Sequence, residues 1–479
     1  HEMSVGAGRF RRVEGAPIEW TTTLDEIEGN LDLAESQGLK VMFELGVYVK
    51  EVFEVEVGEE NGRRLREVVS RFRRHPALLG YYLVDEPYAP QYARVRRARE
   101  LVRAIDPVHP TLSPSLGRAF YYKPTSELCD ILMLSCYPVP YLPIGEVGRR
   151  LDQARSLIGT EKPMWFVAQA VGLRGNDWFP TPVEARCMVY QALARGVTGF
   201  FYFSWIGDQP QQSGHIATVN PAFWDALKKL TLEIAKIAPQ WLTSETIPVV
   251  VDSSSGSCVV ARQVGKRVWV LAVNSGDQPE ALHLDAESEV SWRVWSGDAW
   301  REVQPAQKAL NETIEAYGVR LWEISGKGAK TLSIQSKPQE GEGGEPASLL
   351  PNGSFETDNV SWKLEGAAII AEREAFDGTH CLELTAPSGS ASARSEPFAV
   401  QSGHEVLFSF YVAVDGAAGG TTVDAAVEIE DEAGRLLSRQ PLVGPDECVA
   451  AAMAWDSMGR SLIMPLGAVR ARLVLGTSN

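Results

Sequence analysis

The chain of 479 residues lacks the features that mark several large classes of protein. Basic residues are outnumbered, and the formal net charge of −16 does not suit a nucleic-acid partner, because a phosphate backbone requires a basic surface. The longest strongly apolar run, from Gly196 to Gly207, falls far short of the roughly 20 residues that a membrane span needs. We therefore expect neither nucleic acid nor membrane as a partner, and a neutral or weakly charged substrate fits better.

Cysteine is also scarce. The six cysteines are scattered without the spacing of metal ligands, so the sequence predicts no metal site and no cofactor. Cys381 and Cys448 could pair in a secreted protein, although sequence alone does not establish that bond. The sequence opens at His1 without a signal peptide, and we expect a processed or trimmed chain.

Helix and strand patterns alternate through the first half of the chain. Residues 24–37 have the apolar spacing of an amphipathic helix that begins at a Thr23–Glu26 capping box, and Thr181–Glu184 begins another helix. Such alternation is typical of a parallel sheet that is buried on both faces. The expected strands cover residues 40–46, 78–84, 111–114, 130–135, 164–168 and 197–204.

Two α/β folds share this pattern, the doubly wound sheet and the TIM barrel. No glycine-rich phosphate loop follows any of the strands, so the main signature of nucleotide-binding sheets is missing. A TIM barrel needs eight strands. If residues 197–204 form the eighth, residues 41–44 form the third, and the first two lie in residues 1–20 or are absent. We expect a (β/α)8 TIM barrel over residues 1–242 that is incomplete at its N-terminal end.

The pattern changes near residue 243. Short alternating runs separated by turn signals predict an accessory antiparallel β-sandwich over residues 243–327. Residues 328–348 are rich in Lys, Ser, Glu, Gly and Pro and predict a linker. A second all-β domain is expected over residues 349–479.

The most informative polar residues follow the strand at 78–84. Catalytic groups of a TIM barrel lie at the carboxyl ends of its strands, and here Asp85 and Glu86 end an almost wholly apolar strand before Pro87. Side chains alternate along a strand, so one carboxylate should face the barrel mouth and the other a neighbouring strand or loop. A glycosidase needs a proton donor whose pKa is raised by burial or like charge. Glu86 suits that role with Asp85 as its modulator, unless both acids merely cap the next helix.

A family resemblance rests on these residues. The segment His75-Pro-Ala-Leu-Leu-Gly-Tyr-Tyr-Leu-Val-Asp-Glu-Pro87 resembles the fourth strand of clan-A-like TIM-barrel glycoside hydrolases and their uncharacterised relatives. In that family the acidic residue before the proline is the acid/base, which implies this role for Glu86. The resemblance covers roughly residues 20–240 and implies a superfamily rather than a substrate.

Two further segments carry the same resemblance. Residues 129–138 are similar to the sixth strand of that family, with Tyr137 in place and Ser135 where an acidic residue is common. Residues 181–205 are similar to the seventh helix and eighth strand, whose aromatic end often forms the floor of the sugar site, which implies such a role for Trp205.

The seventh strand departs from the family. Clan-A enzymes carry a catalytic glutamate at its end as the nucleophile, where this sequence has Gln169, which cannot form a glycosyl ester. Glu44 or Asp208 could replace it as nucleophile or base, or the acetamido group of the substrate could attack, as in chitinases and hexosaminidases. Gln169 would then bind sugar hydroxyls, or it is a hydrogen-bonded amide at a strand end.

The terminal domain resembles jelly-roll carbohydrate-binding modules. The segments that carry this resemblance are Leu350-Pro-Asn-Gly-Ser-Phe-Glu356, Trp362 and residues 375–384. In that family a last strand follows the segment matched by residues 469–475, so we expect a module truncated by one strand.

Together these patterns predict a secreted or extracellular glycoside hydrolase that acts on a poly- or oligosaccharide. Glu86 is the expected general acid/base and Asp85 its modulator, and the candidate sugar contacts are Glu44, Tyr137, Gln169, Trp205 and Asp208. The alternatives are a non-catalytic carbohydrate-binding pseudoenzyme, a substrate-assisted hydrolase of the N-acetylhexosaminidase type, and a lyase with Tyr137 as its base.

Overall fold

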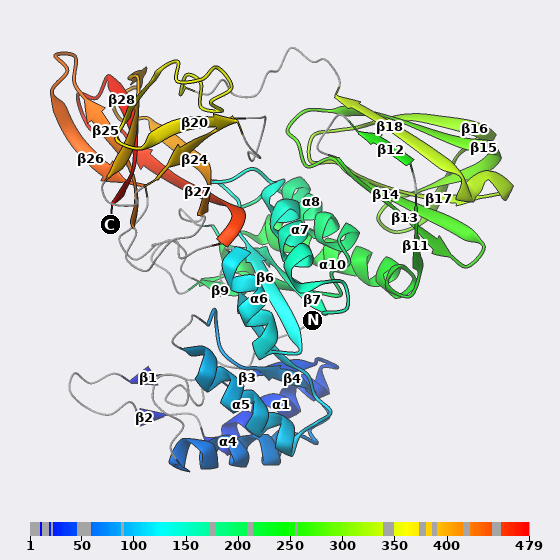
Figure 1. Ribbon diagram of the computed structural model, residues 1–479. Coiled ribbons are helices and arrows are strands. Elements are labelled where there is room, and N and C mark those ends of the chain that lie inside the picture. The colour runs from blue at the N-terminus through cyan, green and yellow to red at the C-terminus, as the bar shows by residue number, and fades with distance from the viewer. Residues whose placement is uncertain are drawn as a thin grey trace. The chain divides into compact units, whose positions relative to one another are not determined.

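The computed structural model describes residues 10–11, 19–20, 23–45, 59–87, 91–115, 117, 119–172, 179–207, 214–248, 250–253, 257–338, 349–372, 380–385, 390–414, 422–442 and 452–478. The chain divides into two compact units (Figure 1). Unit 1 comprises residues 1–139 and 144–338, and unit 2 comprises residues 140–143 and 339–479.

Unit 1 contains a six-stranded parallel sheet with the order β3-β4-β5-β6-β7-β8. The strands are β3 (Val41–Glu44), β4 (Leu78–Tyr82), β5 (Thr111–Ser115), β6 (Ile131–Cys136), β7 (Met164–Gln169) and β8 (Gly199–Phe203). The helices are α1 (Leu24–Ser36), α4 (Glu59–Phe72), α5 (Tyr92–Ile105), α6 (Ala119–Leu128), α7 (Glu146–Ile158), α8 (Pro182–Ala194), α9 (Ile216–Val219) and α10 (Pro221–Leu242). The spatial order of the strands follows the chain order, as it does for consecutive strands of a (β/α) barrel.

The two strands expected before β3 are not part of this sheet. Within residues 1–20 the structure describes only β1 (Phe10–Arg11) and β2 (Glu19–Trp20), which pair with each other in antiparallel orientation. Neither of them pairs with β3 or β8 in the described residues, so the parallel sheet has six strands there and not the eight of a closed barrel.

Local sequence signals explain several of these elements. Both predicted capping boxes are present: Thr23 caps α1 with Glu26, and Thr181 caps α8 with Glu184. Apolar side chains of α1, α4 and α5 share one core with those of β3 and β4, and these include the fully buried Leu31. This packing fixes the two strands whose carboxyl ends carry the predicted acids.

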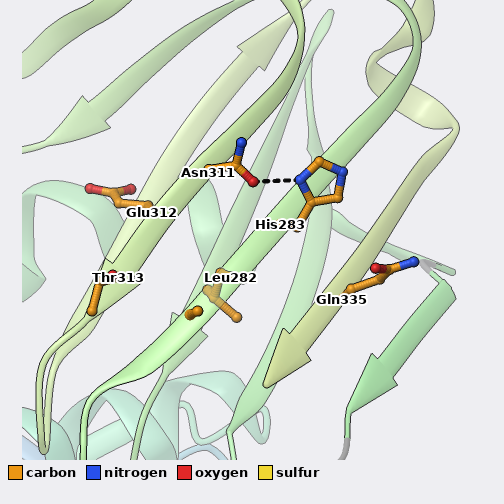
Figure 2. Close-up of a pocket in the computed structure, with 7 residues that line it drawn as sticks. Leu282, His283, Asn311, Glu312, Thr313 and Gln335 are labelled. Carbon is orange, nitrogen blue, oxygen red and sulfur yellow. Dashed lines mark hydrogen bonds between the residues drawn. The ribbon is translucent and has the colours of Figure 1, made fainter. Parts of the chain in front are cut away.

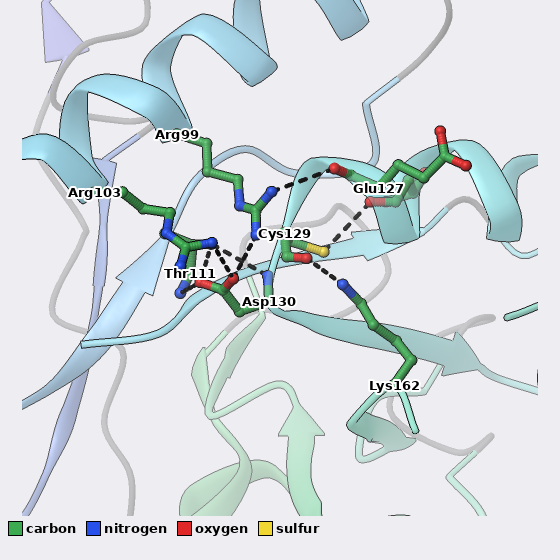
Figure 3. A network of polar contacts seen from close by, with 8 residues as sticks. Arg99, Arg103, Thr111, Glu127, Cys129, Asp130 and Lys162 are labelled. Carbon is green, nitrogen blue, oxygen red and sulfur yellow. Dashed lines mark hydrogen bonds and ion pairs between the residues drawn. The ribbon is translucent and has the colours of Figure 1, made fainter. Parts of the chain in front are cut away.

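A polar network ties the amino ends of β5, β6 and β7 together (Figure 3). The Asp130 carboxylate accepts hydrogen bonds from the Thr111 backbone N–H at 2.9 Å and hydroxyl at 2.8 Å, and it pairs with Arg99. Lys162 donates to the Cys129 carbonyl oxygen. These contacts lie at the amino ends of the strands, so we interpret the network as structural.

Unit 1 also contains the short antiparallel pair of β9 (Ile206–Gly207) and β10 (Gly214–His215). A larger, mostly antiparallel sheet follows with the order β11-β13-β14-β17-β15-β18-β12, in which β16 pairs with β15. Its elements are β11 (Glu245–Ile247), β12 (Val250–Ser253), β13 (Cys258–Val264), β14 (Arg267–Val273), β15 (Glu280–Trp295), β16 (Trp300–Ile314), β17 (Val319–Ser325), the short 3-10 helix η2 (Lys327–Lys330) and β18 (Leu332–Pro338). The predicted antiparallel sheet after residue 243 is therefore present.

This sheet extends into the range expected to be a linker. Strand β18 pairs in parallel with β12 and antiparallel with β15, and its alternate residues Leu332 and Ile334 are buried in the core of the sheet. The sequence did not predict this strand, because its short apolar alternation lies within the mostly polar range of residues 328–348. The linker prediction is thus corrected for residues 328–338, and residues 339–348 lie outside the described part.

Unit 2 consists of antiparallel sheets. Its strands are β19 (Trp362–Glu365), β20 (Ala368–Glu372), β21 (His380–Leu384), β22 (Ala391–Ser395), β23 (Phe398–Ala399), β24 (Glu405–Val414), β25 (Thr422–Glu430), β26 (Leu436–Pro441), β27 (Ala452–Ile463) and β28 (Arg470–Ser478). The largest sheet has the order β19-β22-β28-β25-β26, and its apolar residues share one core with those of the β24–β27 pair. Cys448 lies outside the described residues. Among the helices that the structure describes, none is long and apolar enough to cross a membrane.

Candidate active site

The predicted acids meet at the carboxyl ends of β3 and β4. Glu44 is the last residue of β3 and lies in register with Tyr82, the last residue of β4. Asp85 and Glu86 follow Tyr82 by three and four residues. Parallel strands end at the same edge of their sheet, so the topology brings these three acids to one side of it.

The backbone after β4 separates the two adjacent carboxylates. Strand β4 ends at Tyr82 instead of residue 84, so the alternation of side chains does not decide where Asp85 and Glu86 point. Glu86 has a φ of +41°, a left-handed conformation that costs a non-glycine residue roughly 1–2 kcal/mol. The Tyr82 hydroxyl donates a hydrogen bond of 2.6 Å to Asp85. Asp85 is therefore held by Tyr82 of β4, while Glu86 lies close to Ser135 of β6.

The Glu86 carboxyl group can gain or lose a proton near neutral pH. Burial and the neighbouring Asp85 charge raise its pKa from 4.5 to about 7, although the nearby Ser135 opposes the rise. The side chain is half-buried, so one part of it still reaches solvent.

Glu44 has the same property on the adjacent strand. Burial and the charge of Asp85 raise its pKa from 4.5 to about 7 as well. Asp85 thus acts electrostatically on both glutamates. Two carboxyl groups that titrate near pH 7 beside a third acid are a common arrangement at catalytic sites.

Two tyrosines complete the cluster. Burial and nearby acids raise the pKa values of Tyr82 and Tyr137 well above the usual value of a phenol, so both keep their hydroxyl protons at neutral pH. Tyr137 stacks on Phe203 of β8, with ring centroids 5.4 Å apart and planes inclined by 16°. Tyr137 therefore lies near Glu86 and Asp85, and its ring is held by Phe203.

The three acids do not form a compact metal cage. Within the described residues, the only group of three His, Cys, Asp or Glu ligands with atoms within 4.8 Å of one another is Asp32, Glu35 and His75. The His75 Nδ1 accepts a hydrogen bond from the Ala77 N–H, so Nε2 carries the proton and donates to Asp32 at 3.0 Å. A metal would need the lone pair of that same nitrogen, so we assign no metal to this group.

Gln169 is engaged by the backbone. Its side chain is fully buried, its Nε2 donates to the carbonyl oxygens of Val139 at 2.7 Å and Val171 at 3.0 Å, and its Oε1 accepts from the Val139 N–H at 3.0 Å. The amide holds the segments that follow β6 and β7. These contacts favour the strand-end alternative over a role in binding sugar hydroxyls.

An aromatic group lies at the carboxyl end of β8. Phe203 is 41% exposed and Trp205 is 48% exposed, fractions large enough for either ring to contact a ligand. Trp205 packs near His215 and Trp224, with centroid distances of 5.3 and 4.9 Å. Asp208, the other acid proposed to replace the missing nucleophile, lies outside the described residues.

A separate groove lies on the antiparallel sheet of unit 1 (Figure 2). It has a volume of about 530 Å³ and is lined by Ala281, Leu282, His283, Asn311, Glu312, Thr313 and Gln335. His283 and Asn311 are hydrogen-bonded at 2.6 Å, and Glu312 is held by Arg320 and Trp322. None of the predicted site residues lines this groove.

The site contains residues that the sequence did not single out. Tyr82 binds Asp85, and Phe203 supports Tyr137. Tyr82 lies opposite Glu44 in the pairing of β3 and β4, and the sequence did not indicate this because the expected strand continued to residue 84. The position of Phe203 relative to Tyr137 depends on the pairing of β6, β7 and β8, which only the fold supplies.

No protein-family model matches the chain, and neither does any curated protein. Solved structures match weakly. A glycoside hydrolase family 5 protein from Bacteroides vulgatus is 13% identical, with 68% of this chain and 81% of that chain covered and a TM-score of 0.48. An α-amylase from Geobacillus thermoleovorans complexed with acarbose is 12% identical, with 64% and 81% covered and a TM-score of 0.46. A GH30 endoxylanase from Clostridium papyrosolvens is 11% identical, with 63% and 83% covered and a TM-score of 0.39. With TM-scores below 0.5, these matches do not identify a family for the chain.

Proposed function

We propose that the chain is a glycoside hydrolase in which Glu86 is the general acid/base. One observation carries the proposal: Glu44 and Glu86, from the ends of neighbouring strands, both have pKa values raised to about 7 around Asp85. A general acid works best when its pKa lies near the working pH. The left-handed backbone at Glu86 adds support, because strained residues cluster at functional sites.

The proposed reaction uses the two glutamates in opposite protonation states. Protonated Glu86 gives its proton to the glycosidic oxygen, and the bond from the anomeric carbon to that oxygen breaks. Ionised Glu44 takes a proton from the water that forms the new bond to the anomeric carbon. Solvent exchange then restores both groups. This sequence inverts the configuration, and it requires the two carboxyl groups to stand roughly 6.5–9.5 Å apart.

The charge of the site bears on the substrate. Three acids and two neutral tyrosine hydroxyls surround the proposed reaction centre, and an anionic sugar would be repelled by Asp85 and by any ionised glutamate. We therefore propose a neutral or cationic saccharide, stacked on the exposed rings of Phe203 or Trp205.

Two alternatives follow from Gln169. Gln169 carries an amide, which is bound by the backbone and cannot act as the nucleophile. A substrate with an acetamido group could supply its own nucleophile, and the reaction would then retain configuration. A pseudoenzyme that binds glycans without cleaving them is the other alternative. In both, Glu86 keeps its place beside the bound sugar.

Unit 2 is proposed to be a carbohydrate-binding module of a secreted enzyme. The support is its resemblance to jelly-roll modules and its antiparallel sheets, whose apolar residues share one core. Unit 1 after residue 243 is proposed to be an accessory sandwich.

A hydrolysis screen tests the proposed function. Purified chain is incubated with neutral, cationic and anionic poly- and oligosaccharides, and released reducing ends are measured beside glycan binding by affinity electrophoresis. We expect hydrolysis of a neutral or cationic glycan that Glu86→Gln loses and that Glu67→Gln, an exposed change in α4, keeps. Binding without hydrolysis on the whole panel would contradict the enzyme and favour the pseudoenzyme.

A further inference from the structure

The groove on the antiparallel sheet of unit 1 is built around a row of polar side chains from three strands. In the pairing of β15 with β16 and β18, His283 lies opposite Asn311 on one side and opposite Gln335 on the other. Residues directly opposite each other in neighbouring strands share one face of a sheet, and Figure 2 shows the three side chains in the groove. Neighbouring strands stand about 4.8 Å apart, so the row extends over about 10 Å.

The space beside this row comes from small side chains. The next pair on the same face of β15 and β16 is Ala281 and Thr313, and a methyl group next to longer side chains leaves a hollow. The resulting volume of about 530 Å³ lies in the range of roughly 300–1,000 Å³ that is typical of sites for small ligands. The groove is therefore large enough to receive a small molecule.

The row offers both donors and acceptors to such a molecule. The Asn311 Oδ1 can only accept a hydrogen bond, so the His283 Nδ1, 2.6 Å away, donates to it. In the neutral ring the only proton is then on Nδ1, and Nε2 is left as an acceptor. Asn311 keeps the two protons of its Nδ2, and Gln335 has a free side-chain amide among the described residues.

The groove presents no unpaired carboxylate among the described residues that line it. Glu312 follows Asn311, so alternation places its side chain on the other face of the sheet. There its carboxylate accepts hydrogen bonds from the Arg320 Nε at 3.2 Å and from the Trp322 Nε1 at 2.8 Å. Leu282, opposite Glu312, is buried in the core. The lining thus suits an uncharged ligand with many hydroxyl groups better than an ion.

We propose that this groove is a second saccharide site, which binds a neutral oligosaccharide away from the acids of the candidate active site. Sugar hydroxyls accept from the Asn311 Nδ2 and donate to the His283 Nε2, and Gln335 contacts the neighbouring ring. The acids of the candidate active site belong to the other, parallel sheet of unit 1, so the groove is not part of that site. The choice of a saccharide among hydroxyl-rich ligands rests on the proposed function, and such a site would keep the enzyme on its polymer between cleavages.

The test is a titration of the full-length protein with tetrasaccharides, followed at His283. Histidine labelled with 13C at Cε1 is incorporated, and the His283 resonance is identified by its absence from His283→Gln. The probes are cellotetraose, xylotetraose, maltotetraose and mannotetraose, with tetragalacturonate as an anionic counterpart, and the Glu86→Gln background keeps them intact. At least one neutral probe should shift the resonance saturably with a Kd in the millimolar range, because a few neutral hydrogen bonds give only modest affinity. No saturable shift with any neutral probe, or a shift with tetragalacturonate alone, would overturn the proposal.

Two variants test whether the row itself binds the probe. Asn311→Ala and Gln335→Ala should each raise the Kd about 3–10-fold, the size expected for one lost hydrogen bond. Both residues are exposed, so the melting temperature should not change. Ser291→Ala, an exposed change on β15 outside the groove, should leave the Kd as it is. Equal Kd values in all three variants would show that the row does not bind the probe and would contradict the proposal.

Hydrolysis separates this inference from the proposed function. If a neutral probe shifts the His283 resonance but the wild-type protein hydrolyses no glycan, the second site stands and the hydrolase proposal fails. If the wild-type protein hydrolyses a glycan that leaves this resonance unmoved at every concentration, the hydrolase proposal stands and the second site fails. Where both hold, Asn311→Ala should raise KM for the polysaccharide and leave kcat/KM for a small glycoside unchanged.

Discussion

At the residue scale, the two glutamates that suit the site for proton transfer lower the stability of the fold. Glu44 and Glu86 have pKa values near 7 when folded, against 4.5 ordinarily, so the folded chain binds these two protons more tightly than the unfolded chain. Stability therefore falls as pH rises from about 4.5 to about 7, and the loss is complete above that range. The left-handed backbone at Glu86 adds to this cost.

Replacing both glutamates should remove this loss of stability at high pH. Glu44→Gln/Glu86→Gln should melt at a higher temperature than wild type at pH 8, where both native carboxyls are ionised, and at a similar temperature at pH 4. Calorimetry at the two pH values measures the difference, with Glu67→Gln as an exposed control that should shift both melting temperatures equally. An equal effect of the double variant at both pH values would be incompatible with the raised pKa values.

The sequence predicted the acids of this site but not their arrangement. Asp85 and Glu86 stood out because they follow an apolar strand, and Glu44 because it ends another. Their mutual orientation depends on the end of β4 at Tyr82 and on the φ of Glu86, and neither has a signature in residue type. The spacing of apolar residues shows where a strand lies, but it does not show at which residue the strand ends.

At the scale of elements, most predicted helices and strands are present within a few residues, and the exceptions have physical causes. Helix α6 was missed because it contains Pro124, which normally ends a helix. Strand β18 was missed because its seven residues lie in a polar, glycine-rich range. Gln169 was predicted at a strand end, but its three backbone hydrogen bonds could not be foreseen from the sequence.

Gln169→Glu should damage the fold instead of creating a nucleophile. The new carboxylate would be buried and would face the carbonyl oxygens of Val139 and Val171, to which the amide now donates. We expect a loss of roughly 2–4 kcal/mol in the free energy of unfolding. Chemical denaturation measures it, with Gln240→Glu on the exposed side of α10 as the control. A stable variant that forms a glycosyl ester at position 169 would show that this strand end is a nucleophile site after all.

At the scale of the whole molecule, the division of the chain differs from the predicted one in a way that matters for experiments. Unit 1 continues to Pro338, because β18 completes the sheet between β12 and β15. A boundary at residue 327, as the sequence predicts, would remove that strand.

Two truncations should therefore behave differently. A chain that ends at residue 338 should fold and retain turnover on small soluble glycosides, while binding insoluble polysaccharide more weakly. A chain that ends at residue 327 exposes the edges of β12 and β15 and should melt at a clearly lower temperature. Equal stability of the two, or an equal loss of small-substrate turnover, would show that the boundary at 338 has no structural meaning.

The central claim, that Glu86 gives a proton to the leaving oxygen, is tested most directly by the dependence of rate on the leaving group. The measurement compares kcat/KM of wild type and Glu86→Gln on alkyl or sugar glycosides and on the matching 2,4-dinitrophenyl glycoside, whose leaving group departs without a proton. The account predicts a loss of about 10²–10⁴ on the first kind of substrate and little loss on the second. An equal loss on both, or no loss on either, would contradict it.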